Sequence, residues 1–122
     1  MRKACFSGLP KTEWLPDGRN VRLLEDFTFT DANGIEWKAE ANDTPDGSSI
    51  PRPAWTLIGS PFVGKHRNAS IVHDKFCVLR ERSGRTHKQV HKMYYNACLC
   101  AGVGKIKAKM MYLAIKIGGP KW

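Results

Sequence analysis

The sequence contains no long apolar run, and this excludes an ordinary transmembrane helix. No stretch approaches the roughly 18 apolar residues that such a helix requires. The start, MRKACFSGLPKTEWLPDG, meets Gly, Pro, Lys and Glu before the apolar core of a signal peptide could form. We therefore expect a soluble, cytoplasmic protein without a visible export signal.

Paired cysteines are also missing. The four cysteines do not form the CxxC spacing of a zinc ribbon or of a thiol redox site. Apolar neighbours surround them and three fall within predicted helices, which favours reduced thiols packed in the core. Two disulfides in an oxidising compartment are the alternative. The four residues are Cys5, Cys77, Cys98 and Cys100.

Acidic residues are scarce in the second half of the chain. The net charge is +9, yet residues 1–60 carry seven Lys or Arg against nine Asp or Glu, whereas residues 61–122 carry thirteen against two. This asymmetry favours an anionic partner for the second half: nucleic acid, a nucleotide, a phospholipid surface or an acidic host protein. A solvated helical face of long basic side chains explains the same composition without a partner.

The length of 122 residues suits one domain in which strands precede helices. Alternating apolar residues around an Asn-Gly turn predict a β-hairpin or small antiparallel sheet, so residues 1–42 should be mainly β. Closely spaced prolines with Gly and Ser predict a loop over residues 43–53. Residues 54–122 have helical spacing. The fold class is therefore α+β.

The helical half should contain a short helix ended by Gly59 and then three long helices. The first long helix runs from about Arg67 to Arg82, and Thr86 caps the second. The short link between them folds the two into an antiparallel hairpin. The third spans KIKAKMMYLAIKIGG, and its apolar stripe is expected at Ile106, Met110, Leu113 and Ile117.

The helix hairpin can bring histidines together. His73 lies about ten residues before the turn and His91 about seven after it, so their heights differ by about one helical turn. His87 and His91 are four residues apart, the spacing at which two imidazoles of one helix can meet a metal ion. Asp74 follows His73 inside an apolar run, where an ionised carboxylate is rarely buried without a partner.

Three interpretations of these four side chains are open. In the first, His73 is a general base that activates water and is oriented by a polar group on the facing helix. In the second, the four side chains share zinc or a similar divalent ion. HKQVH has the histidine spacing of a zincin, but Lys88 stands where the glutamate base should be. In the third, His73 completes a hydrogen-bond network in the core and the others are solvated.

The loop over residues 43–53 is a second candidate site. Asp46 could bind a cation or pair with an arginine, and Gly47 allows backbone amides to approach a ligand closely. Ser48 and Ser49 offer hydroxyl groups. The alternative is that these side chains only hold the loop and cap the helix that follows.

Three segments match a known family in the same order. They are PDGSSIPRPAW, ASIVHDKFCVLR, and HKMYYNACLCAGVGKIKAKMMYLAIKIGGPKW with an arginine before it. Over residues 20–122 the chain resembles the bacteriophage and prophage family known as domain of unknown function 1353. The resemblance implies a protein of the host cytoplasm during infection or of the virion. The residues that match the family pattern are Asp46, Ser49, Pro51, Arg52, His73, Asp74 and Arg85.

Two positions depart from this family pattern, which usually has Tyr or Trp near Cys77 and Asp in place of His91. His91 can accept a hydrogen bond or bind a metal, but it supplies no fixed negative charge. More distantly, HDKFC followed by a polar partner on the next helix is similar to the His-Asp dyad of phospholipases A2. This likeness implies an esterase-like reaction in which Asp74 helps to hold calcium and the facing residue orients His73.

The leading hypothesis is a small phage-type hydrolase with His73 as the base, His91 as the orienting group, and Asp74 and Asp46 as ligands of Ca²⁺ or Zn²⁺ or as anchors. The alternative is a non-catalytic phage accessory protein that binds an anionic partner through its basic helices. A virion or lysis component that works by protein contacts alone is the third reading. The side chains expected to contact an anion are Arg52, Lys65, Arg67, Arg80, Arg82, Arg85 and Lys88.

Overall fold

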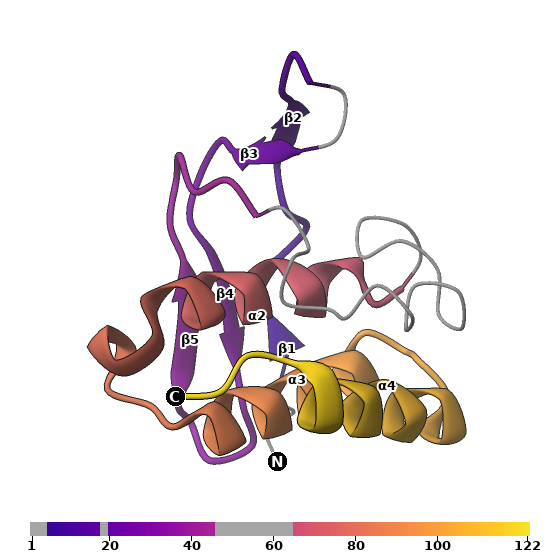
Figure 1. Ribbon diagram of the computed structural model, residues 1–122. Helices are drawn as coiled ribbons and strands as arrows, with labels where there is room; N and C mark the ends of the chain where they lie inside the picture. Colours follow the sequence, from indigo (N-terminus) through magenta and orange to yellow (C-terminus); the bar gives the residue numbers. More distant parts are fainter. Residues whose placement is uncertain (1–4, 18–19, 46–64) are drawn as a thin grey trace.

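The computed structural model of the chain describes residues 5–17, 20–45 and 65–122, and their order of elements confirms an α+β fold (Figure 1). In this part of the chain, short strands come first and three α-helices follow. The predicted loop beyond Pro45 and the short helix ended by Gly59 lie outside the described residues. So do four candidate site residues, namely Asp46, Ser48, Ser49 and Arg52.

The described strands form two small antiparallel sheets. One sheet has the order β1-β4-β5, and the other pairs β2 with β3. The strands are β1 (Cys5–Phe6), β2 (Thr12–Trp14), β3 (Val21–Leu23), β4 (Phe27–Thr30) and β5 (Glu36–Ala39).

The hairpin of β4 and β5 confirms the predicted alternation. Phe29 pairs with Trp37 and Phe27 with Ala39, and all four side chains are buried. Successive residues of a strand point to opposite faces, so this register turns one apolar face toward the helices. Gly34 adopts φ +81° in the turn, a conformation that glycine takes at no steric cost.

The helices begin and end close to the predicted residues. Thr86 caps α3 with a capping box, in which its hydroxyl accepts from the Gln89 amide and the Gln89 side chain accepts from the Thr86 amide. Gly84, at φ +73°, ends the link between the first two helices. The elements are α2 (Arg67–Leu79), the 3₁₀ turn η1 (Arg80–Ser83), α3 (His87–Cys100) and α4 (Lys105–Gly118).

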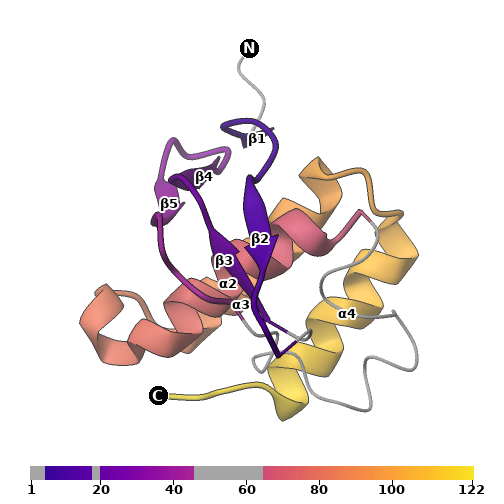
Figure 2. The same ribbon diagram turned by 90° about the horizontal axis from the view of Figure 1, so that it is seen from above.

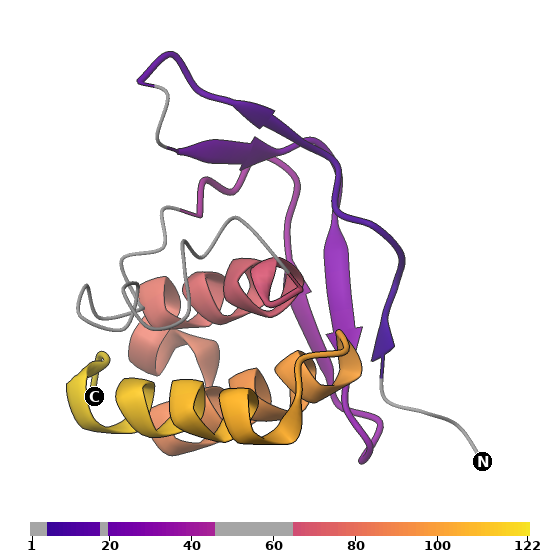
Figure 3. The ribbon, with the colours of Figure 1, turned by 90° about the vertical axis from the view of Figure 1, so that its right-hand side faces the viewer.

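The strands and helices occupy different sides of the molecule (Figure 3). Helix α2 packs on β4 and β5, α3 packs on α2, and α4 packs on α3. Seen from above, α4 lies to one side of the crossing of α2 and α3 (Figure 2). The helix hairpin is therefore the central layer, with the sheet on one flank and α4 on the other. None of the described helices is long and apolar enough to cross a membrane.

The predicted apolar stripe of α4 is wrong. Ala108, Met111 and Ile115 are fully buried, whereas the predicted stripe faces outward. Both sets recur at helical spacing, and the small Ala108 side chain allows α4 to approach α3 closely. Spacing alone could not identify which of the two faces meets α3. The exposed fractions are 80% for Ile106, 41% for Met110, 43% for Leu113 and 76% for Ile117.

The cysteines of the helices agree with the expectation of reduced thiols. Cys77 and Cys98 are buried free thiols, and Cys100 is a partly buried free thiol. Burial raises the pKa of the Cys98 thiol to about 12, so it packs as a neutral side chain at pH 7.

Candidate functional site

His73 and His91 meet across the helix hairpin. His73 Nε2 on α2 lies 2.9 Å from His91 Nδ1 on α3, and both side chains are buried. The link through η1 reverses the chain, so the two residues come to similar heights along the hairpin. Of the predicted site residues, these two form a direct contact.

The segment after α4 completes this contact from the other side. His91 Nε2 lies 2.8 Å from the carbonyl oxygen of Pro120. A carbonyl oxygen only accepts hydrogen bonds, so Nε2 of His91 carries a proton and donates it. In a neutral imidazole the other nitrogen then has a lone pair, and Nδ1 of His91 accepts.

The direction of this hydrogen-bond chain defines the tautomer of His73. Because His91 Nδ1 accepts, His73 Nε2 must be the donor. Nδ1 of a neutral His73 therefore carries a lone pair that the His91 hydrogen bond does not use. A neutral imidazole that donates through Nε2 has its basic lone pair on Nδ1, and a buried imidazole oriented in this way can act as a general base.

Burial keeps both imidazoles neutral. Loss of hydration lowers the pKa of His73 well below its ordinary value, and the nearby His91 lowers it further. Burial also lowers the pKa of His91, although the hydrogen bond to Pro120 opposes this and the charges of His87 and Lys121 support it. The directions of the two hydrogen bonds, from His73 to His91 and from His91 to Pro120, require both rings to be neutral.

Two further described side chains, Tyr94 and Cys77, lie close to His73. The Tyr94 ring centroid lies 4.9 Å from that of His73, and burial raises the pKa of Tyr94 well above its usual range. Cys77 Sγ lies 3.8 Å from His73 Nδ1 and 3.6 Å from Nε2. Nearly equal distances to the two nitrogens put the sulfur beside the ring, not in line with the Nδ1 lone pair.

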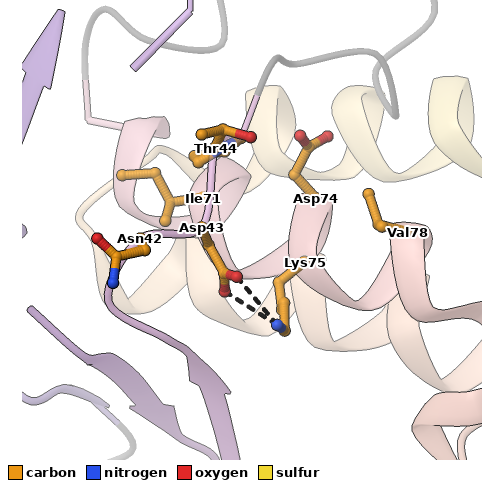
Figure 4. Close-up of a pocket in the computed structure, with 8 residues that line it drawn as sticks. Asn42, Asp43, Thr44, Ile71, Asp74, Lys75 and Val78 are labelled. Atoms are coloured by element: carbon orange, nitrogen blue, oxygen red, sulfur yellow. Dashed lines mark hydrogen bonds and ion pairs between the residues drawn. The ribbon is translucent and has the colours of Figure 1, made fainter. Parts of the chain in front are cut away.

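Asp74 lines a pocket next to this pair (Figure 4). The pocket has a volume of about 190 Å³ and lies between α2 and the segment that follows β5. Asp43, on the opposite wall, accepts hydrogen bonds from Lys75 Nζ at 3.1 and 3.0 Å. Asp74 is 2% exposed, so its carboxylate belongs to the interior. The pocket therefore combines buried acidic oxygen atoms with an apolar wall that includes Ile71 and Val78.

Two sets of side chains in the described part of the chain have metal-binding chemistry. Asp74, Asp43 and Thr44 offer oxygen atoms of the kind that Ca²⁺ prefers, although Lys75 neutralises Asp43. The side chains of His73, Cys77 and His91 offer nitrogen and sulfur ligands within 4.8 Å of one another, as zinc prefers.

In the set of His73, Cys77 and His91, the two histidines already bind each other. The two nitrogens that face each other, His73 Nε2 and His91 Nδ1, already form a hydrogen bond. A zinc ion between them would have to displace the shared proton. The geometry therefore favours the hydrogen-bonded pair at this point. His87, which we expected to share a metal with His91, has Nδ1 2.7 Å from the carbonyl oxygen of Trp122.

The predicted anion-binding residues are distributed over more than one surface. Arg85 and Lys88 line a groove of about 330 Å³, where the Arg85 guanidinium lies 5.2 Å from the centre of the Trp37 ring. Lys92 lines the same groove. The other described members of the predicted set are exposed residues of α2, η1 and the turn before α2: Lys65, Arg67, Arg80 and Arg82.

Sequence reasoning missed three participants. Cys77 could have been found, because it follows His73 by one helical turn. Lys92 could have been found in the same way, one turn after Lys88. The carbonyl of Pro120 gave no signal, because any residue supplies a backbone carbonyl and only the tertiary fold brings this one to His91.

Comparison with known proteins identifies the family. The family described as "Protein of unknown function (DUF1353)" matches residues 21–115. The chain is 41% identical over 100 residues to the uncharacterized protein y4jT of Sinorhizobium fredii (strain NBRC 101917 / NGR234), which is 82% of this chain and 29% of that protein. It is 34% identical over 119 residues to the uncharacterized protein y4iH of the same strain, 97% of this chain and 48% of that protein.

The chain thus spans less than half the length of these two curated relatives. No solved structure matches it. The match over residues 21–115 extends from β3 through most of α4 and includes His73, Asp74 and His91. The chain belongs to the DUF1353 family.

Proposed function

We propose that the protein is a hydrolase in which His73 activates water for attack on an ester. The observation that carries this proposal is the directed chain of hydrogen bonds from His73 through His91 to the Pro120 carbonyl. In this tautomer His73 is a neutral, oriented imidazole whose basic nitrogen is Nδ1, the atom that would accept a proton from water. The likeness of HDKFC to the His-Asp helix of phospholipases A2 supports the same chemistry.

The proposed reaction needs one proton acceptor and one oriented water. Nδ1 of His73 removes a proton from water while the water oxygen bonds to the ester carbonyl carbon. His91 accepts the Nε2–H hydrogen bond of the resulting imidazolium, and the Pro120 carbonyl fixes the orientation of His91. When the tetrahedral intermediate collapses, Nδ1 returns the proton to the leaving alkoxide.

The substrate carbonyl is proposed to enter through the pocket at Asp74. Asp74 is adjacent to His73 on α2, and this pocket has an apolar wall that an acyl chain could contact. A Ca²⁺ ion held by Asp74, together with Asp46 as expected from the sequence, would polarise the ester carbonyl. Asp74 otherwise acts as an ion-pair partner inside the protein.

A hydrolysis assay with matched variants tests the proposal. His73→Gln retains a donor close to the position of Nε2 and removes the imidazole base. We expect the purified protein to hydrolyse p-nitrophenyl butyrate or dioleoylphosphatidylcholine, and we expect His73→Gln to lower kcat by about a hundredfold or more. Lys11→Gln, at an exposed position before β2, is the control and should retain the rate. Hydrolysis that survives in His73→Gln, or that is absent from the wild type, contradicts the proposal.

A second candidate function is binding of an anionic partner without catalysis. The observation in its favour is the groove that Arg85, Lys88 and Lys92 line beside Trp37. Nucleic acid, a nucleotide or an acidic host protein would meet three cations and one aromatic ring there. The affinity for such a partner should fall steeply with salt.

Variants separate the two candidates. Charge removal by Arg85→Gln and Lys88→Gln should weaken the binding of a fluorescent single-stranded oligonucleotide or of ATP, whereas His73→Gln should not. Wild-type binding that is absent, or that ignores these two substitutions, contradicts the second candidate.

The biological setting is part of the proposal. Resemblance of the loop, the His-Asp helix and the closing segment to phage and prophage proteins supports action in the host cytoplasm during infection or in the virion. Immunodetection in fractions of infected cells and in purified virions tests this directly. Absence of the protein from both fractions contradicts it.

A further inference from the structure

Helix α4 exposes an apolar stripe on the side away from its buried face. The stripe consists of Ile106, Met110, Leu113 and Ile117, hereafter the outer stripe, and its terminal residues are 80% and 76% exposed. Its spacing along the chain keeps all four side chains on one face of the helix. Scattered apolar residues are ordinary on protein surfaces, but four in line along one helix are the pattern of a contact face.

The charges of α4 are all of one sign. The helix carries four lysines and no acidic residue between Lys105 and Gly118. The ion pairs found in the described part of the chain involve Lys11, Arg22, Lys38 and Lys75, so none lies on α3 or α4. Among the described residues, the lysines of α4 therefore flank the outer stripe without an ion pair to a carboxylate.

Tyr112 lies on the side of α4 toward Tyr95 of α3, next to lysines that flank the outer stripe. The ring centre of Tyr112 lies 5.8 Å from Lys109 Nζ and 5.9 Å from Lys116 Nζ. Tyrosine has an apolar ring and a polar tip, and lysine has an apolar stem and a charged head. Both residue types suit the boundary between a hydrocarbon layer and water.

The outer stripe and the four lysines of α4 together favour one kind of partner over others. A second copy that paired its outer stripe with this one would bring eight lysines together without carboxylates, because each α4 carries four. A nucleic acid would satisfy the lysines but would leave the four aliphatic side chains without apolar contacts. An anionic phospholipid surface meets both needs, since acyl chains accept the stripe and headgroups pair with the lysines.

We infer that α4 docks the protein on anionic phospholipid bilayers, with its axis parallel to the surface and the outer stripe inserted at the boundary of headgroups and acyl chains. This inference goes beyond the proposed hydrolase and does not depend on it, because docking requires neither His73 nor turnover. Helix α4 has 14 residues and lies on the surface without spanning it.

Vesicle co-sedimentation tests the inference. We expect the wild type to bind vesicles of phosphatidylcholine with 30 mol% phosphatidylglycerol, and to bind pure phosphatidylcholine vesicles at least about tenfold more weakly. Replacing the stripe ends by Ile106→Gln and Ile117→Gln should weaken binding by at least about tenfold. Lys109→Gln with Lys116→Gln should weaken it similarly and reduce its dependence on salt.

Matched controls separate docking from general effects. Leu9→Gln removes a 79% exposed apolar residue from the segment between β1 and β2, and it should leave vesicle binding unchanged. Lys11→Gln with Lys38→Gln removes two exposed charges from the strand side of the molecule, and it should cost less than twofold. Circular dichroism and thermal unfolding check that each variant is folded.

Three outcomes overturn the inference. The first is a wild type that does not bind anionic vesicles. The second is binding that persists when the folded Ile106→Gln and Ile117→Gln variant is used. The third is a dimer in analytical ultracentrifugation that these substitutions dissociate, combined with no vesicle binding, because the outer stripe would then be an interface between copies.

Discussion

His73 Nε2 donates a hydrogen bond to His91 Nδ1 over 2.9 Å, and His91 in turn donates to the carbonyl of Pro120 over 2.8 Å. This relationship orients one imidazole by means of another. A carboxylate in the place of His91 would accept the same hydrogen bond and would add a negative charge beside His73. His91 orients His73 but adds no negative charge that would raise the pKa of His73. Burial therefore dominates, and it lowers this pKa.

A carboxylate at position 91 should therefore restore basicity. We predict that His91→Asp raises the pKa of His73 by about one unit or more relative to the wild type, because a nearby negative charge favours the imidazolium. NMR titration of the imidazole resonances measures this pKa. Asn96→Asp is the matched control, since it adds the same charge elsewhere on α3 and should shift His73 much less. An unchanged pKa in His91→Asp would show that residue 91 does not interact with His73 as described.

The stability of the protein should depend on pH between about 7 and 5. The folded-state pKa of His73 lies below its ordinary value of about 6.5, so the unfolded chain binds more protons in this window. The stabilisation from a neutral His73 is complete above about pH 6.5 and is lost as the pH falls toward the folded-state pKa. The free energy of unfolding should therefore fall as the pH drops below about 6.5, and the lowered pKa of His91 acts in the same direction.

Chemical denaturation at several pH values measures this dependence. In His73→Gln the slope of unfolding free energy against pH should become smaller, whatever the absolute stability of the variant. Lys11→Gln, which removes no imidazole and lies at an exposed position before β2, should keep the wild-type slope. A wild-type free energy of unfolding that is constant from pH 7 to pH 5 would contradict the neutral, buried state of His73.

The capping box of α3 should make a measurable contribution to stability. Thr86→Ala removes the hydroxyl that accepts from the Gln89 amide, and we predict a loss of about 1 kcal/mol in the free energy of unfolding. Thr86→Ser keeps the acceptor and should cost much less. Equal losses in the two variants would mean that the methyl group of Thr86, not its hydroxyl, is important.

The orientation of α4 can be tested by two substitutions of the same type. Ile115→Ala removes a fully buried side chain and should cost about 2–4 kcal/mol. Ile106→Ala removes a side chain that is 80% exposed, and the change should stay within about 0.5 kcal/mol. Urea denaturation measures both values. A larger loss for Ile106→Ala than for Ile115→Ala would mean that the outer stripe, not the face with Ile115, is buried.

Local chemistry allowed much of the fold to be predicted. The alternation from Phe27 to Ala39 around an Asn-Gly turn was sufficient for the hairpin, because hairpin register depends on neighbours in the sequence. Thr86 marked the start of α3 in the same way. Strands β1 and β2 were not expected, since each has only two or three residues, too few to show an alternating pattern, and β1 pairs with β4 more than 20 residues along the chain.

The candidate site was predictable only in part. The spacing of His73 and His91 from the turn brought them to similar heights, and the hydrogen bond between them agrees with that expectation. The position of the Pro120 carbonyl, which defines the tautomers, depends on how the segment after α4 packs and has no sequence signature. Similarly, the apolar spacing of α4 fits Ile115 and Ile117 equally well, yet Ile115 is buried and Ile117 is exposed.

The tautomer of His73 is the most direct test of the account. Long-range ¹H–¹⁵N correlation spectra of the wild type at pH 7, assigned with His73→Gln and His91→Gln, report which ring nitrogen carries the proton. We predict a neutral His73 with the proton on Nε2 and a lone pair on Nδ1, and a neutral His91 with the proton also on Nε2. A proton on Nδ1 of His73, or a charged His73 at pH 7, would contradict the proposed role of His73 as the base.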